Sequence, residues 1–80
     1  MPVVELYSKP GCHLCEIAKA KITELRRKAE FLFVEIDIQE IPELFEKYRE
    51  SIPVILVNGR VFSRYDVNPE ELLLQLISLN

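Results

Sequence analysis

The chain has little of several features, and each scarcity excludes a class of protein. Its 80 residues include only two glycines and no low-complexity tract, which excludes a collagen-like or repetitive chain. No apolar run approaches the roughly 18 residues of a membrane span, so we expect no membrane partner. The N-terminal stretch MPVVELYSKPG lacks the basic region and the long apolar region of a signal peptide. These observations predict a cytoplasmic protein.

The residues that are present favour a small folded domain. Hydrophobic residues make up 49% of the chain and charged residues 29%, which excludes a disordered protein. The length fits one domain that spans residues 1–80. Ten basic residues against thirteen acidic residues give a net charge of −3. This mild acidity argues against nucleic acid as the main partner.

Cysteine is also scarce, but its placement is informative. Two cysteines are too few for a disulfide-stapled secreted domain, which usually carries four or more. Cys12 and Cys15 form a lone C-x-x-C. In the cytoplasm such a pair is more often catalytic or metal-binding than structural.

The first 38 residues predict a strand, a helix and a second strand. Val3–Tyr7 is a short apolar run that ends in a Pro-Gly turn, which indicates a buried strand. Apolar residues three or four apart predict an amphipathic helix of about four turns from Leu14 to Ala29. Phe31–Ile38 predicts the second strand, parallel to the first. The nearly continuous apolar character of both strands predicts a sheet that is covered on both faces.

The middle of the chain predicts a short helix and a hairpin. Pro42–Arg49 predicts the helix, because proline is tolerated at a first helical position. Val54–Val57 and Arg60–Ser63 flank the pair Asn58-Gly59. This dipeptide between apolar runs predicts a two-residue turn and antiparallel strands.

A third helix is predicted at the C-terminal end. Asn68 is expected to cap it, Pro69 to open it, and Glu71 to return a hydrogen bond to the cap. Its apolar stripe is expected to cover the core through five residues: Leu72, Leu73, Leu76, Ile77 and Leu79. The resulting fold class is α/β, with element order βαβαββα and a four-stranded mixed sheet flanked by three helices.

The C-x-x-C falls where the first strand gives way to the first helix. A helix N-terminus presents unpaired N–H groups and the positive end of the dipole, so the pKa of Cys12 should fall below the free value of about 8.5. The thiolate is the form that attacks disulfides. Cys15 lies one helical turn away, where it can resolve a mixed disulfide formed at Cys12.

Other interpretations of the pair stay open. A structural zinc site needs four ligands, whereas the chain offers two cysteines and the single histidine His13, so we expect no metal site within one chain. A zinc ion or cluster shared between two chains, a structural disulfide and inert buried thiols are the alternatives. His13 either stabilises the Cys12 thiolate as an imidazolium or is simply solvated. Lys9 has the same two interpretations.

Three segments resemble the glutaredoxin-like branch of the thioredoxin superfamily: ELYSKPGCHLC, VEIDI and SIPVILVNG. The resemblance covers essentially the whole chain and implies a thioredoxin-like fold, with the first strand between the second and third and the fourth at an edge. It implies that Cys12 is the nucleophile, Cys15 the resolving cysteine and Pro53 a cis-proline. It also implies that the Ile52 backbone pairs with an extended substrate segment. His13 and Leu14, between the cysteines, are then expected to contact substrate.

The sequence departs from typical glutaredoxins at three places, one of which is Ser51-Ile52-Pro53 in place of Thr-Val-Pro. The motif is Cys-His-Leu-Cys instead of Cys-Pro-Tyr-Cys. After the hairpin, residues 63–67 replace the Gly-Gly pair and acidic residues that help to hold glutathione, and only Asp66 resembles the acidic element. Arg64 is either a partner for a substrate carboxylate or a solvated charge on an edge strand.

Taken with the resemblance, the sequence predicts a monomeric thiol–disulfide oxidoreductase that reduces disulfides of proteins or of small molecules. No cofactor is expected to be bound. Glutathione is a candidate substrate or reductant, and a disulfide reductase is the other candidate reductant. The alternatives are a non-catalytic thioredoxin-fold binding module, a metal or cluster carrier that uses Cys12 and Cys15, and a peroxide-reducing or redox-sensing protein.

Overall fold

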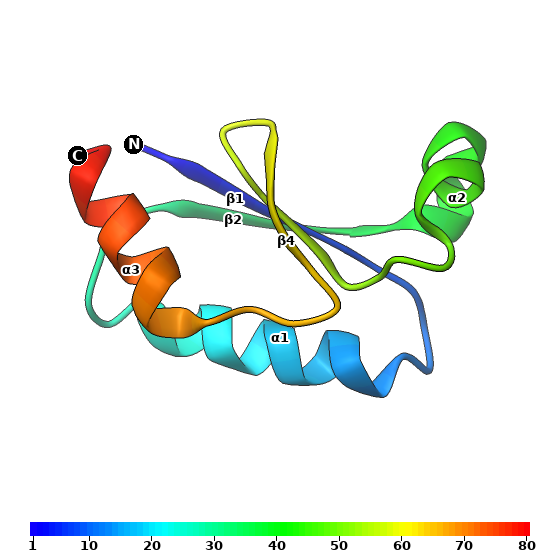
Figure 1. Cartoon of the computed structure of the whole chain (residues 1–80), viewed down its shortest axis with the longest axis horizontal. Coiled ribbons are helices and arrows are strands. Elements are labelled where there is room, and N and C mark those ends of the chain that lie inside the picture. The colour runs from blue at the N-terminus through cyan, green and yellow to red at the C-terminus, as the bar shows by residue number, and fades with distance from the viewer.

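The computed structural model describes all of residues 1–80 and contains the seven expected elements in the expected order. The sheet has the order β2-β1-β3-β4, in which β1 and β2 are parallel and the other neighbours are antiparallel. Figure 1 shows α1 and α3 along one side of the sheet and α2 at its right-hand end. The elements are β1 (Val3–Ser8), α1 (His13–Leu25), β2 (Leu32–Asp37), the 3₁₀ turn η1 (Ile38–Glu40), α2 (Pro42–Tyr48), β3 (Val54–Val57), β4 (Arg60–Arg64) and α3 (Pro69–Ser78).

The larger hydrophobic cluster lies between the sheet and the pair α1 and α3. Alternate residues of β1 point into it, because side chains along a strand face opposite sides in turn. We call these 11 buried residues the large cluster: Val4, Leu6, Ala18, Ile22, Leu25, Phe31, Ile55, Val57, Val67, Leu72 and Leu76. This cluster fixes α1, and with it the C-x-x-C at the helix start.

The other face of the sheet is covered only at one end. Its five buried residues, here called the small cluster, are Tyr7, Ile38, Tyr48, Val54 and Leu56. Helix α2 has seven residues, so it is only about 10 Å long and covers the end nearest the C-x-x-C. Leu32, Val34 and Val61 stay exposed beyond it. The expectation of a sheet covered on both faces is therefore confirmed for one whole face and for only part of the other.

Helix α1 ends four residues earlier than its apolar periodicity predicts. The N–H groups of Arg26, Arg27 and Lys28 donate to carbonyls three residues back, at 3.1, 3.3 and 2.8 Å. This tight geometry is typical of a last turn that leaves the α-helix. Ala29 lies outside the helix but still packs against the large cluster, which explains why it fits the apolar pattern.

Helix α3 has the predicted cap and a narrower buried face than predicted. The Asn68 side chain accepts hydrogen bonds from the N–H groups of Glu70 and Glu71, at 3.0 and 3.2 Å. The expected return bond from the Glu71 side chain is not formed. Leu72 and Leu76 are buried and Leu73 is half-buried, whereas the outer residues Leu74, Ile77 and Leu79 are exposed. A helix packed on one side buries only the part of an apolar stripe that faces the core.

The hairpin between β3 and β4 has the predicted turn. Asn58 and Gly59 both have positive φ, at 50° and 82°, as a type I′ turn requires. The turn is also tied to β1, because the Asn58 N–H donates to the Val3 carbonyl and the Asn58 side chain accepts from the Val3 N–H, both at 2.9 Å. None of the helices has the length and hydropathy needed to cross a membrane.

Candidate functional site

The two cysteines lie at the start of α1 and form a disulfide bond. The chain leaves β1, turns at Gly11 with a φ of +78°, and reaches Cys12, which is the N-cap of α1. The Cα atoms of Cys12 and Cys15 are 5.2 Å apart. Cys12 is half-exposed, whereas Cys15 is only 2% exposed. A molecule that approaches from solvent therefore meets the Cys12 sulfur first.

The local geometry favours negative charge on Cys12. Its Sγ accepts a hydrogen bond from the Cys15 N–H at 3.2 Å, as a capping side chain does at a helix start. The backbone of α1 begins here too, because the Glu16 N–H donates to the Cys12 carbonyl at 3.1 Å. A thiolate at this position receives an N–H group and the positive end of the helix dipole.

Pro53 and Ile52 lie at the same end of the sheet as the disulfide. Val54 pairs with Tyr7, so Pro53 is next to the point where β1 leads into the C-x-x-C loop. The Ile52–Pro53 peptide bond is cis, as the resemblance implies. Neither the N–H nor the carbonyl of Ile52 makes a hydrogen bond within the chain. The backbone donor and the backbone acceptor of Ile52 are thus both unpaired.

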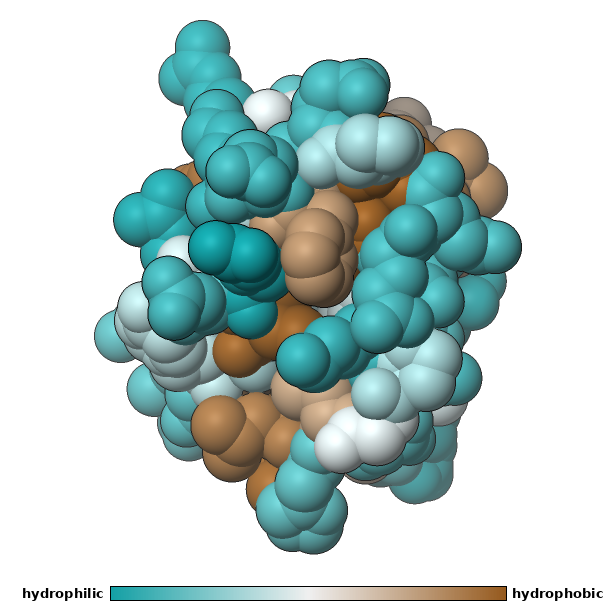
Figure 2. Space-filling model, turned by 90° about the vertical axis from the view of Figure 1, so that its right-hand side faces the viewer, coloured by the Kyte–Doolittle hydropathy of each residue, from teal (hydrophilic) through white to brown (hydrophobic).

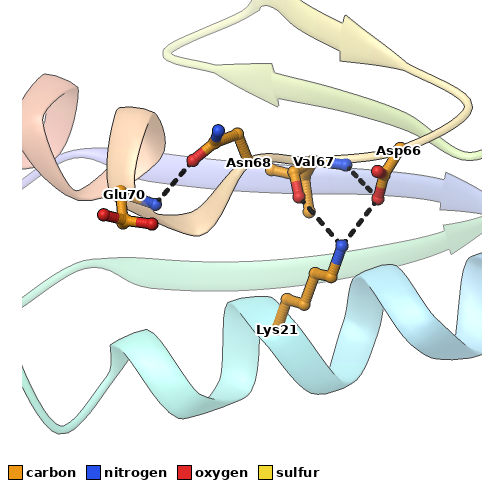
Figure 3. A network of polar contacts seen from close by, with 5 residues as sticks. All are labelled: Lys21, Asp66, Val67, Asn68 and Glu70. Atoms are coloured by element: carbon orange, nitrogen blue, oxygen red, sulfur yellow. Dashed lines mark hydrogen bonds and ion pairs between the residues drawn. The ribbon is translucent and has the colours of Figure 1, made fainter.

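The loop after β4 is fixed beside Pro53 by several hydrogen bonds. The Tyr65 N–H donates to the Pro53 carbonyl at 2.7 Å. Lys21 of α1 donates from its Nζ to Asp66 Oδ1 at 2.8 Å and to the Val67 carbonyl at 3.3 Å (Figure 3). The Val67 N–H donates to the same Asp66 oxygen at 2.8 Å. These two donors, chiefly Lys21, lower the pKa of Asp66 below its usual value.

Tyr65 was not predicted to have a role. It has a φ of +71°, a conformation that bulky residues rarely adopt, and its side chain is 54% exposed. The only signal in the sequence is that residues other than glycine stand where glutaredoxins carry a Gly-Gly pair. No local pattern predicts that a tyrosine takes the left-handed conformation there.

One flank of the C-x-x-C is polar. A surface cavity of about 360 Å³ is lined by Ser8, Lys9, Pro10, Glu16, Lys19, Glu35, Asp37 and Glu40. Within it the buried Ser8 hydroxyl donates to Glu35 at 3.0 Å, and Lys19 pairs with Glu35 at 2.9 Å. The hydrogen bond to Glu35 raises the pKa of Lys19. Lys9 belongs to this flank.

The opposite flank is apolar. Leu14 is 51% exposed and Ile17 is 38% exposed, one turn apart along α1. Figure 2 views the end of the molecule where α1 begins and shows apolar surface in its middle with hydrophilic residues around it. The Cys12–Cys15 disulfide thus lies between an apolar flank and a polar flank of the start of α1.

The remaining predicted residues are solvated. His13 is exposed and its ring makes no hydrogen bond, so neither interpretation of its role is favoured. Arg64 is exposed on the edge strand β4 and forms no ion pair. The chain assembles no group of three or more His, Cys, Asp or Glu side chains that could hold a metal ion.

Comparison with known proteins places these features in a family. The model of a glutaredoxin-like domain (DUF836) matches residues 3–77. An uncharacterized protein of Mycobacterium tuberculosis is 29% identical over 76 residues, which are 89% of this chain and 78% of that protein.

Two solved structures show the same fold. Protein Ne2328 from Nitrosomonas europaea has a TM-score of 0.81 at 25% identity, over 94% of this chain and 91% of that one. A mutant thioredoxin from Halobacterium salinarum has a TM-score of 0.68 at 17% identity, over 96% and 73% of the two chains. The fold is therefore thioredoxin-like, and the Cys12–Cys15 pair at disulfide distance supports a redox-type function.

Proposed function

This chain belongs to the glutaredoxin-like domain family, and we propose that it is a thiol–disulfide oxidoreductase with Cys12 as nucleophile and Cys15 as resolving thiol. The observation that carries the proposal is the unequal exposure of the two cysteines at the start of α1. Cys12 is half-exposed and caps the helix, whereas Cys15 is buried one turn further on. A substrate sulfur reaches Cys12 and is kept from Cys15.

The proposed reaction is a pair of thiol–disulfide exchanges. In the first, the Cys12 thiolate attacks one sulfur of the substrate disulfide, which forms a mixed disulfide and releases the other substrate sulfur as a thiolate. In the second, the Cys15 thiolate attacks the Cys12 sulfur, closes the Cys12–Cys15 disulfide and releases the second substrate thiolate. Two electrons pass from the protein to the substrate, and the two released thiolates take protons from Cys15 and solvent.

The oxidised protein then needs two electrons from outside. Two molecules of a small thiol such as glutathione, or one dithiol of a disulfide reductase, restore the two cysteines by the same exchanges in reverse. The chemistry uses only cysteine sulfurs, so the proposal includes no bound cofactor. Substrates are disulfides of proteins or of small molecules.

Substrate is held by the backbone next to the disulfide. An extended segment that donates to the Ile52 carbonyl and accepts from the Ile52 N–H lies beside cis-Pro53, at the same end of the sheet as Cys12. His13 and Leu14 are exposed between the cysteines and contact the same segment.

The assignment of roles is tested with Cys12→Ser and Cys15→Ser, which are matched because each removes one sulfur. We expect Cys12→Ser to abolish reduction of a peptide disulfide. We expect Cys15→Ser to accumulate a mixed disulfide at Cys12, visible as an added substrate mass that a reductant removes. Full activity of Cys12→Ser, or a mixed disulfide found at Cys15 in that variant, would contradict the proposal.

The midpoint potential of the wild-type pair tests the function itself. Equilibration in graded thiol buffers, with free thiols counted by mass, should give a reversible couple between about −270 and −120 mV, the span of known thiol–disulfide oxidoreductases. A potential below about −300 mV would instead indicate a structural disulfide. Failure to form any intramolecular disulfide, together with bound metal, would indicate a metal carrier.

A further inference from the structure

We propose that Leu14, Ile17 and Tyr65 form an apolar docking surface that selects polypeptide disulfides with an apolar side chain next to the reacting cysteine. We call these three residues the apolar flank. The inference rests on the proposed function and specifies its substrate class. It follows from the placement of exposed apolar side chains on one side of the disulfide and not on the other.

The helix face that carries Leu14 and Ile17 is tied, one turn further on, to the loop after β4 that carries Tyr65. Positions 14, 17 and 21 share one face of an α-helix, because they are three and four residues apart. Lys21, the last of them, holds Asp66 and Val67 at 2.8 and 3.3 Å. Tyr65 is the residue before Asp66, so the helix face that begins with Leu14 beside Cys12 leads to Tyr65.

Tyr65 is held in place before any partner binds. The Tyr65 N–H donates to the Pro53 carbonyl. The side chain of the next residue, Asp66, accepts a hydrogen bond from Lys21 (Figure 3). These contacts keep a tyrosine at a φ of +71°, where residues with a Cβ are rare, while its ring stays 54% exposed. The backbone of Tyr65 is therefore fixed, and a tyrosine side chain, which has only two rotatable bonds, contacts apolar groups at a low entropy cost.

The surroundings favour a polypeptide over a small charged disulfide. Asp66, the only acidic residue of this loop, already has its Oδ1 bound by Lys21 and by the Val67 N–H. The five surface cavities of the chain are lined by residues other than Cys12, Cys15 and Tyr65, so the disulfide lies on an open surface. The free backbone groups of Ile52 suit an extended chain, whose neighbouring side chain then meets the apolar flank.

The test compares two peptides that each contain one disulfide and differ at one position, with leucine or serine next to the reacting cysteine. Wild-type protein is compared with Tyr65→Asn, which removes the ring but tolerates positive φ, and with Tyr65→Phe, which keeps the ring. We expect Tyr65→Asn to lower the ratio of kcat/KM for the leucine peptide over the serine peptide about fivefold to tenfold. The loss should lie in KM. Tyr65→Phe should restore the ratio.

Leu74→Asn is the matched control, because Leu74 is an exposed apolar residue on α3, outside the apolar flank. It should keep the wild-type ratio. Equal losses for the two peptides in Tyr65→Asn, or no loss for either peptide, would each overturn the proposal. A wild-type protein that reduces none of these disulfides would overturn the proposed function instead, and circular dichroism of the variants separates either result from misfolding.

Discussion

The two hydrophobic clusters on opposite faces of the sheet differ in size and in what they support. The large cluster contains 11 buried residues and joins two helices to the central strands. The small cluster contains five and lies under α2 only. Ile52, which flanks the cis-proline, packs against the small cluster and not the large one. We infer that one face of the sheet maintains the fold, while the other positions the Ile52 backbone, which we propose pairs with substrate.

The difference follows from the helices available to each face. Helices α1 and α3 have 13 and 10 residues, whereas α2 has seven. Burying an aliphatic side chain contributes roughly 1.5–3 kcal/mol to folding, so a cluster of twice the size carries most of the stability. The short α2 is enough to support Ile52, and it leaves the far end of its face of the sheet open. Variants in the two clusters should therefore affect different measurements.

The largest effect is expected for Ile22→Ala in the large cluster. Ile22 is fully buried, and truncating such a residue to alanine costs about 2–5 kcal/mol because it leaves a cavity. Urea unfolding should show this loss with an unchanged slope. Ile77→Ala is the matched control, because Ile77 is exposed on α3, and should change stability by less than about 0.5 kcal/mol. Equal losses in the two variants would mean that the large cluster does not dominate stability.

A smaller loss of stability, with an effect on substrate, is expected for Leu44→Ala. Leu44 of α2 is half-buried and packs against the small cluster together with Ile52. Its truncation should cost about 1 kcal/mol, less than a fully buried leucine. It should also raise KM for a disulfide peptide about threefold, because the Ile52 backbone loses support.

The control for Leu44→Ala is Leu32→Ala, on the open end of the same face, where Leu32 is exposed. This variant should leave KM unchanged. A change in KM in both variants, or in neither, would break the link between the small cluster and the substrate backbone.

The sequence predicted the elements that depend on local patterns. The bounds of β3 were predicted correctly, and so were the Asn58-Gly59 turn and the Asn68 cap, because each depends on residues that are neighbours in the chain. The placement of Cys12 at a helix start also came from local signals. The sheet order was implied by the resemblance, and the structure confirms it.

The features that the sequence missed depend on tertiary packing. The open half of the second face cannot be seen in the apolar runs, since Leu32 and Leu6 have the same hydropathy but only Leu6 is buried. The contact between Lys21 and Asp66 joins residues 45 positions apart, and no periodicity relates them. The apolar flank depends on this contact, so it could be found only in three dimensions.

The smallest effect is expected at the contact between Lys21 and Asp66, the tether from α1 to the loop that carries Tyr65. Because Lys21 and the Val67 N–H lower the pKa of Asp66, the contact stabilises the folded protein above the ordinary pKa of an aspartate. This stabilisation is lost as the pH falls through the lowered pKa. Both side chains are partly or largely exposed, so the contribution to stability is small.

Lys21→Gln should therefore raise the pKa of Asp66 toward its ordinary value, measured by NMR titration of the Asp66 carboxyl carbon. It should also reduce the preference for the leucine peptide, though less than Tyr65→Asn does, because the Tyr65 N–H still binds Pro53. Arg27→Gln is the control, since Arg27 pairs only with its helix neighbour Glu24 on the surface. An Asp66 titration that does not move in Lys21→Gln would mean that the Val67 N–H alone sets it. The apolar flank would then be held by the backbone of the loop and not by the helix that carries the disulfide.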